Sequence, residues 1–140
     1  MELTPAESAR YRRHLALPEV GEAGQARIKA ASVLIVGLGG LGAPAAAYLA
    51  SAGVGRLGLC DLDAVDESNL QRQILFSESD LGRAKLEAAR SRLSAMNSAV
   101  TLTGHAGLRT FNAADMISGY DAVVDCTDNF AARFLLADAC

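Results

Sequence analysis

The chain lacks the residue patterns that build zinc sites, disulfide frameworks and membrane spans. Its three cysteines, Cys60, Cys126 and Cys140, form no Cys-x-x-Cys pair, so the sequence indicates neither a zinc site nor a set of disulfides. The longest apolar run, residues 43–52, is too short and too rich in alanine to cross a bilayer. Residues 1–13 contain no apolar signal-peptide segment. We therefore expect a cytoplasmic protein with reduced thiols that does not enter a membrane.

Aromatic residues and excess positive charge are also scarce. There is no Trp, and aromatics make up only 5% of the chain, so the core must be built from aliphatic side chains. The net charge of -3 is unlike the strongly basic balance of nucleic-acid-binding modules, so no nucleic-acid partner is expected. Apolar residues, by contrast, make up 51% of the 140 residues, which is enough for one globular domain with a core.

Apolar strands alternate with helical patterns after a polar N-terminal region. The run SVLIV at residues 32–36 is typical of a strand buried on both faces of a parallel sheet. We predict strands at residues 32–36, 56–60, 100–103 and 122–125, and helices at residues 43–52, 81–96, 112–117 and 129–140. The alternation predicts an α/β protein with a Rossmann-like, doubly wound, mostly parallel sheet.

The domain organisation follows from the same pattern. Residues 1–30 form an N-terminal helical extension that Pro18 and Gly21 break into two pieces. Residues 31–140 form a nucleotide-binding α/β domain. Four strands make little more than one nucleotide-binding half, and the last predicted helix has no end signal. We therefore expect this domain to be truncated at its C-terminal end, as part of a longer enzyme.

A glycine-rich turn connects the first strand to the first helix of the domain. Gly37 permits the tight turn, Gly39 and Gly40 let the backbone approach a ligand, and Gly42 allows close helix–sheet packing. The free amides of the following helix favour an anion. Since no Lys-Ser or Lys-Thr follows, the turn is not a Walker phosphate loop. It indicates nucleotide binding, and the alternative is a purely structural turn.

Acidic and basic side chains downstream of the turn are the candidate ligand contacts. Asp61 ends the second strand, where an acidic residue holds ribose hydroxyls in this architecture. Asp63 and Asp66 lie nearby, although loop carboxylates are usually only solvated. Arg72 and Lys85 are the candidate phosphate partners, because an arginine fork and a lysine point charge both suit phosphate.

Another candidate group follows the last predicted strand. Asp128 is placed to hold Mg²⁺, which often binds one or two carboxylates together with phosphates, although Asp128 and Asn129 also suit a helix cap. We expect Asp125 to be structural. Arg13 belongs to a basic cluster in the N-terminal region that could equally be a solvated face, and His105 has no partner at ligand spacing.

Taken together, these motifs resemble the ubiquitin-activating-enzyme-like family of ThiF/MoeB type, which adenylates small sulfur-carrier proteins. The resemblance covers the whole chain. It rests on Arg10-Tyr11-Arg12-Arg13-His14, Val36 to Gly42, Asp61-Leu62-Asp63, Ser68-Asn69-Leu70-Gln71-Arg72-Gln73, Gly82-Arg83-Ala84-Lys85 and Asp125-Cys126-Thr127-Asp128-Asn129. The family includes the molybdopterin-synthase and thiamine-biosynthesis adenylyltransferases.

The resemblance implies a function and its machinery. It implies that ATP with Mg²⁺ adenylates the C-terminal glycine carboxylate of a small ubiquitin-like sulfur-carrier protein and that pyrophosphate is released. It implies a homodimer in which an arginine matching Arg13 reaches the partner subunit's site, and structural zinc only after Cys140. It implies catalytic roles for Arg13, Arg72, Lys85 and Asp128. The implied nucleotide contacts are Gly37, Gly39, Gly40, Gly42, Asp61, Asp63, Ser68, Asn69, Leu70, Gln71, Arg72, Gln73, Lys85, Asp128 and Asn129, with Asp128 at the metal.

Three alternatives remain open on the sequence. A nicotinamide- or flavin-dependent oxidoreductase would also carry the glycine turn, but it would leave Arg72, Lys85 and Asp128 without a role. A second alternative is an inactive dimerising fragment of the adenylyltransferase. Within the family, an ATP-dependent tRNA-modifying dehydratase fits less well, since the net charge is negative and no basic tail is present.

Overall fold

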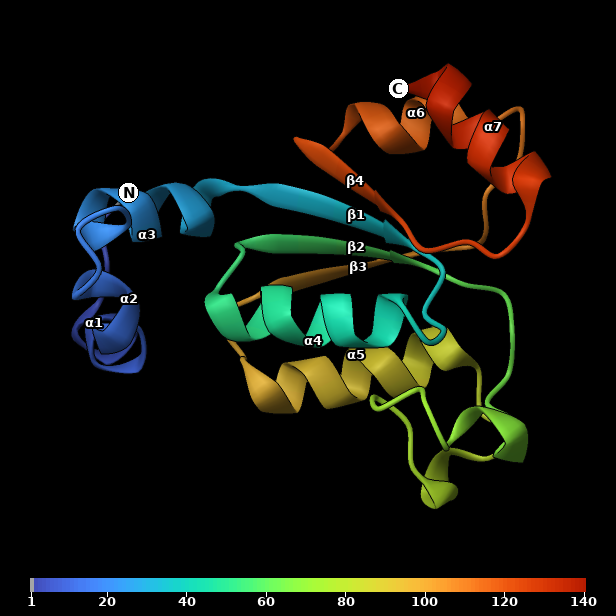
Figure 1. The fold of residues 1–140 in the computed structure, drawn as a ribbon, viewed down its shortest axis with the longest axis horizontal. Helices are drawn as coiled ribbons and strands as arrows, with labels where there is room; N and C mark the ends of the chain where they lie inside the picture. The colour runs from blue at the N-terminus through green and yellow to red at the C-terminus, as the bar shows by residue number, and fades with distance from the viewer. Residues whose placement is uncertain (1) are drawn as a thin grey trace.

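The computed structural model describes residues 2–140, and its centre is a four-stranded parallel sheet with the order β3-β2-β1-β4 (Figure 1). The strands are β1 (Ser32–Val36), β2 (Arg56–Cys60), β3 (Thr101–His105) and β4 (Ala122–Asp125). Three of them have the predicted bounds, whereas β3 runs two residues further than the predicted 100–103. In β3, Gly104 and His105 continue the register and lie opposite Leu59 and Cys60 of β2.

Helices cover both faces of the sheet, which confirms the predicted α/β class. α4 (Gly42–Ala52) and α5 (Lys85–Met96) lie on one face, and α6 (Ala113–Ser118) and α7 (Phe130–Ala139) lie on the other (Figure 1). Alternate residues of β1 pack against the helices on the two faces of the sheet. Ile35 packs in the aliphatic core under α4 and α5, and Leu34 packs with residues of α6 and α7. The central strand is therefore buried on both sides, as its unbroken apolar sequence predicts.

Small residues allow close approach at two places in the sheet and its helices. α4 buries Ala43, Ala46 and Ala50 completely, so its backbone lies close to the strands. In β2, Gly58 leaves room for the ring of Tyr120, which a methyl group at position 58 would strike. The Tyr120 hydroxyl also lies 2.7 Å from Nε2 of His105, so a hydrogen bond joins the two side chains.

The N-terminal extension comprises α1 (Pro5–Arg10), α2 (Arg12–Leu15) and α3 (Gly21–Ala30). It begins with the predicted capping box, in which the Thr4 hydroxyl accepts from the backbone N–H of Glu7. Three helices form in place of the two pieces predicted, because Tyr11 interrupts the first one. Tyr11 is 4% exposed, and its hydroxyl accepts a hydrogen bond from Asn97 Nδ2 at 2.9 Å. This buried contact fixes the extension to the α/β domain.

The segment between β2 and α5 differs most from the prediction. α5 begins at Lys85 and not at residue 81, because the preceding residues are held by the β2–α5 loop. Gly82, in a left-handed conformation with φ 78°, donates to the Val65 carbonyl, and the Val65 N–H donates to the Arg83 carbonyl. Short 3-10 turns, η1 (Glu67–Asn69) and η2 (Glu78–Asp80), complete this loop. Within residues 2–140, no helix is long and apolar enough to cross a membrane.

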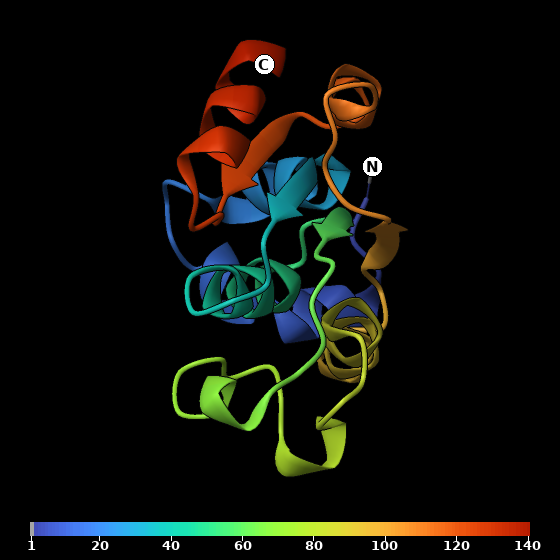
Figure 2. The ribbon, with the colours of Figure 1, turned by 90° about the vertical axis from the view of Figure 1, so that its right-hand side faces the viewer.

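Figure 2 looks onto the end of the sheet at which the parallel strands finish. The connections after β1, β2 and β4 leave the sheet at this end, and the long loop after β2 runs outward before it returns to α5. The N-terminal helices lie toward the opposite end of the strands (Figure 1). Ligands of open α/β sheets bind beyond the carboxyl ends of the strands, so this is the end on which to look for a site.

Candidate nucleotide-binding site

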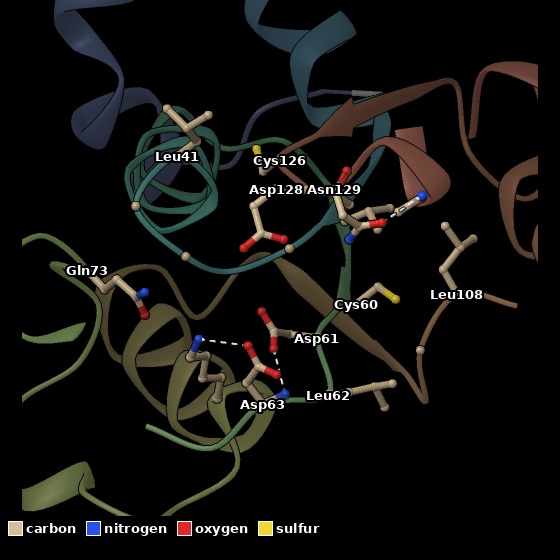
Figure 3. A pocket seen from close by; sticks show the side chains of 18 of the residues that line it. Leu41, Cys60, Asp61, Leu62, Asp63, Gln73, Leu108, Cys126, Asp128 and Asn129 are labelled. Atoms are coloured by element: carbon tan, nitrogen blue, oxygen red, sulfur yellow. Dashed lines mark hydrogen bonds and ion pairs between the residues drawn. The ribbon is translucent and has the colours of Figure 1, made fainter. Parts of the chain in front are cut away.

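A cavity of about 580 Å³ opens at the carboxyl ends of β1, β2 and β4. Its size falls within the range of small-molecule sites. Its walls come from the glycine turn, the residues after β2, the loop before α5, the loop after β3 and the loop after β4 (Figure 3). Predicted site residues in the lining are Gly37, Gly39, Gly40, Asp61, Asp63, Asn69, Arg72, Gln73, Lys85, Asp128 and Asn129.

The glycine turn is shaped by close backbone contacts on one side and opens to the cavity on the other. Gly37 has φ 91°, and a Cβ there would lie 2.7 Å from the Cys126 carbonyl oxygen. A Cβ on Gly42 would strike the Gly37 carbonyl. Only glycine fits at either position. Toward the cavity, a Cβ on Gly40 would lie 3.5 Å from Arg72 Cδ, so the turn directly faces a guanidinium-bearing side chain.

The helix after the turn starts without a side-chain cap. α4 begins at Gly42 with Leu41 as its N-cap residue, and no side-chain hydrogen bond satisfies its first amides. Free amides and the positive end of the helix dipole favour an anion at this point. The turn therefore supplies an anion-binding surface within the cavity.

Asp61 is tied to the backbone on both sides of the cavity. Its Oδ2 accepts a hydrogen bond from the Leu38 N–H at 2.7 Å, and its Oδ1 accepts one from the Asp63 N–H at 2.8 Å (Figure 3). A carboxylate oxygen has two acceptor positions, so these bonds leave capacity for ribose hydroxyls. The structure thus adds a loop-organising role that the sequence alone did not indicate.

Two cations and an amide gather opposite the glycine turn. Arg72 donates from Nη1 to the Ser68 carbonyl at 2.9 Å, which directs its guanidinium along the cavity wall. Lys85 is 5% exposed, and its Nζ lies 3.2 Å from Oδ2 of Asp63. Gln73 is 3% exposed, and its buried Oε1 has no hydrogen-bond partner among the residues the structure describes. An unpaired buried amide oxygen facing a cavity can accept a hydrogen bond from a ligand or a bound water.

Four of the predicted contact residues, Gly42, Ser68, Leu70 and Gln71, do not line the cavity. Gly42 shapes the turn. Ser68 holds Arg72 with its carbonyl and donates its hydroxyl to Asp66 at 2.6 Å. Leu70 packs against the aliphatic core. Gln71 is exposed on the loop surface. Asn69, by contrast, both lines the cavity and accepts from the Asp66 N–H in the η1 cap.

Some polar residues of the β4–α7 loop form structural hydrogen bonds, and another points into the cavity. Asp125 accepts from the N–H and the hydroxyl of Thr127, as expected for a structural residue. Asn129, and not Asp128, caps α7 by accepting from the Ala132 N–H. The exposed Asp128 carboxylate points into the cavity that also receives Asp61 (Figure 3).

The donor set suits a magnesium ion only in part. No group of three His, Cys, Asp or Glu residues in the described part of the chain is arranged to hold a metal. Mg²⁺, however, commonly binds one or two carboxylates and takes its other ligands from phosphates and water. Asp128 fits that need as a single carboxylate beside a phosphate site.

The structure brings residues to the cavity that the sequence analysis missed. Arg133 of α7 donates through Nε and Nη2 to the Thr127 carbonyl at 3.2 and 2.9 Å, and so holds the loop that carries Asp128. Leu62 and Leu108 form an apolar wall on the far side of Asp61 from Gln73 (Figure 3). The helical pattern around Arg133 was visible in the sequence, but nothing in it marked this side chain as a cavity residue.

Two thiols also line the cavity. Burial raises the pKa of both the Cys60 and the Cys126 thiols above their usual value. The thiolate is the reactive form, so a raised pKa lowers the fraction of either thiol that is reactive at neutral pH.

Arg13 lies apart from the cavity. It is exposed on α2, in the N-terminal extension at the opposite end of the sheet from the glycine turn (Figure 1). Within one subunit it is not among the residues that line the cavity.

Comparison with known proteins identifies close relatives. The sequence profile of the ThiF family matches residues 11–140. The chain is 54% identical over 140 residues to the adenylyltransferase and sulfurtransferase MOCS3 of Drosophila yakuba, covering 99% of this chain and 31% of that protein. It is 49% identical over 138 residues to the probable adenylyltransferase/sulfurtransferase MoeZ of Mycobacterium tuberculosis, covering 98% of this chain and 35% of that protein. The chain therefore spans about a third of the length of these curated relatives.

Solved structures share the fold. The E. coli tRNA N6-threonylcarbamoyladenosine dehydratase TcdA in complex with AMP has a TM-score of 0.93 and 30% sequence identity, covering all of this chain and 57% of that one. The same enzyme in complex with ATP gives a TM-score of 0.90 at 30% identity, covering 97% and 56%.

Proposed function

This chain belongs to the ThiF family, and on that premise we propose that it is the nucleotide-binding part of an adenylyltransferase. Its substrates would be ATP and the C-terminal carboxylate of a small ubiquitin-like sulfur-carrier protein. The observation that carries the proposal is the cavity itself. One space brings together a strand-end carboxylate, an uncapped helix start, Arg72 and Lys85, which match the ribose and phosphates of a nucleotide.

The nucleotide has one natural orientation in this cavity. Asp61 lies between an apolar wall and a polar wall of the cavity, and it would accept hydrogen bonds from the ribose hydroxyls. Leu62 and Leu108 offer apolar surface for a base on one side. The glycine turn, Arg72 and Lys85 lie on the other side and would take the phosphates. Asp128 would hold the Mg²⁺ that neutralises phosphate oxygens when it is bound.

The reaction needs positioning and charge stabilisation more than acid–base catalysis. A carboxylate oxygen of the carrier attacks the α-phosphorus, a bond forms between them, and the bond from that phosphorus to the β-phosphate oxygen breaks. Pyrophosphate leaves with the electron pair. The attacking carboxylate is already ionised at neutral pH, so no general base is required. Arg72 and Lys85 would stabilise the charge on the phosphates as this exchange proceeds.

Pyrophosphate exchange in the presence of the carrier tests the proposal. We expect Arg72→Ala to lower the exchange rate by on the order of 10²-fold, as loss of one preorganised charge contact does in other enzymes. Arg83→Ala is the matched control, because Arg83 is also an arginine of the β2–α5 loop but pairs with Asp80 at 2.6 Å. Equal rates for the Arg72 variant and the wild type would exclude this site.

Arg13 is proposed to act on the partner subunit of a homodimer, in line with the family resemblance. Its place at the opposite end of the sheet from its own cavity supports a role in trans. Arg13→Ala and Arg72→Ala subunits, mixed and allowed to exchange at random, should then regain activity in about a quarter of the sites. A mixture no more active than either variant, despite exchange verified by co-purification with an affinity-tagged subunit, would refute the trans role.

A tRNA-modifying dehydratase is the second candidate, because TcdA shares the fold with a TM-score of 0.93. Sequence identity favours the first candidate, since it reaches 54% with MOCS3 and only 30% with TcdA. Pyrophosphate exchange that depends on a carrier protein supports adenylation of the carrier. Exchange that responds to tRNA and not to a carrier would favour the dehydratase.

A further inference from the structure

We propose that Asp63 is an exchangeable counter-ion for Lys85, which holds the lysine in the nucleotide-free protein and releases it to incoming phosphates. The consequence is specific: removing the charge of Asp63 should tighten binding of a triphosphate. This inference rests on the proposed function, in which the ligand of the cavity carries phosphates.

Asp63 holds Lys85 at two points. The side chains form an ion pair, with Lys85 Nζ 3.2 Å from Asp63 Oδ2 (dashed in Figure 3). The backbone N–H of Lys85, the first residue of α5, also donates to the Asp63 carbonyl at 2.9 Å. A bridge between Ala64 and Ala84 continues this pairing of the two segments. The loop after β2 and the start of α5 are therefore locked together at the residue that carries the ammonium group.

The exposure of the two partners is strongly unequal. The Lys85 side chain is only 6% exposed, whereas that of Asp63 is 73% exposed. An ammonium so far removed from water needs an anion beside it, because an unpaired buried charge is costly. Asp63 can return to water at little cost when the lysine leaves. This asymmetry allows the lysine to change partner, since only Lys85 depends on the pair.

The position of Lys85 supports the same role. A cation at the first turn of a helix is disfavoured by the helix dipole, and a carboxylate there is favoured. Asp63 therefore compensates Lys85 in the empty cavity. A phosphate that enters beside the glycine turn offers the lysine a more highly charged partner. The flexible lysine stem allows its ammonium to follow. The Asp63 carboxylate then opposes binding, because it competes with the phosphates for the Lys85 ammonium.

Asp61 links this pair to the rest of the cavity. Its two oxygens accept from Asp63 N–H and Leu38 N–H, so the backbone at Asp63 is fixed relative to the glycine turn. Exchange of the lysine between partners therefore requires movement of side chains only.

The test compares affinities for ATP and adenosine, measured by calorimetry on wild type, Asp63→Asn and Glu67→Gln. Glu67 is an exposed carboxylate in η1 of the same loop, so its variant removes an equal charge outside the cavity. We expect Asp63→Asn to bind ATP about three- to tenfold more tightly, both with Mg²⁺ and in EDTA, because the variant lacks the carboxylate that competes with phosphate for Lys85. Adenosine affinity should change by less than about twofold, and Glu67→Gln should change neither.

The decisive experiment repeats the Asp63→Asn and Glu67→Gln substitutions in a protein that also carries Lys85→Met. If Asp63 acts through the lysine, Asp63→Asn should change ATP affinity in that background no more than Glu67→Gln does. Equal tightening with and without Lys85 would mean direct repulsion of the phosphates, and would refute the counter-ion role. Unchanged or weaker ATP binding by Asp63→Asn, with a wild type that binds ATP, would also overturn it. A wild type that binds no ATP would instead overturn the proposed function on which the inference rests.

Discussion

Replacing Asp61 with alanine should damage the fold and the site together, and the two effects can be measured separately. The substitution removes the acceptor of the Leu38 N–H bond at 2.7 Å and of the Asp63 N–H bond at 2.8 Å. Both bonds end on a carboxylate, and both organise loops that line the cavity. Asp61→Asn is the graded partner variant, because its single carbonyl oxygen can keep one of the two bonds.

The expected magnitude follows from these two bonds. A hydrogen bond to a charged group contributes about 1.5–3 kcal/mol net when it is well shielded. Water reaches this half-buried carboxylate and can replace part of each bond, so we expect about 2 kcal/mol in total for Asp61→Ala and about 1 kcal/mol for Asp61→Asn. For a chain of this length, 1 kcal/mol corresponds to a shift in Tm of about 4 °C. The alanine variant should therefore melt about 8 °C lower.

Nucleotide affinity is the second measurement. Loss of the proposed ribose contact should weaken ATP binding by about 10- to 100-fold in Asp61→Ala, measured calorimetrically well below the Tm of the variant. An unchanged Tm would show that the carboxylate does not hold the glycine turn and the β2 loop in solution. An unchanged affinity with a lowered Tm would mean that Asp61 is a structural residue alone.

Three further predictions concern the turn, the N-terminal cap and the metal. Gly42→Ala should prevent normal folding of the glycine turn, because the new methyl group would strike the Gly37 carbonyl; a cooperative melt near that of the wild type would contradict this. The pKa of Glu7 lies at about 2, lowered from 4.5 chiefly by its bond to Lys29, so its charge stabilises the fold above pH 4.5 and this contribution is lost as the pH falls toward 2. The difference in Tm between wild type and Glu7→Gln should accordingly shrink over that interval, and a constant difference would refute the assignment. Asp128→Asn should raise the Mg²⁺ concentration needed for half-maximal exchange, because a neutral amide is a poor Mg²⁺ ligand, whereas an unchanged midpoint would exclude Asp128 from the metal site.

Local sequence patterns predicted the elements whose structure depends on local causes. β1 follows from a short apolar run rich in β-branched residues, and α1 starts at its capping box with the expected Thr4–Glu7 bonds. Long-range contacts account for the differences. The buried Tyr11, at which the N-terminal helix is interrupted, accepts a hydrogen bond from Asn97, which lies far away in the sequence. α5 starts late because Val65 binds the backbone of the segment before it.

The candidate site likewise contains residues that local patterns predicted and contacts that they did not. Asp61 and Lys85 were predicted from their places at a strand end and a helix start, and the structure brings both to one cavity. Their partners were not predicted. The ion pair of Lys85 with Asp63, and the fork of Arg133 on Thr127, depend on loop conformations that no periodic pattern encodes. The sequence therefore indicated which residues are candidate ligand contacts, whereas tertiary contacts decide how their side chains are held.

Gly58 and Tyr120 form a matched pair whose sizes cannot vary independently. The tyrosine ring occupies the space that any side chain on Gly58 would need, and Arg56 stacks over the same ring at 4.3 Å. Among relatives, a larger residue at position 58 should therefore be accompanied by a smaller one at position 120. Loss of the ring would also remove the partner of the Arg56 guanidinium. A larger residue at position 58 would accordingly need a smaller residue at position 120 to arise first, so the pair restricts the order in which this sheet can evolve.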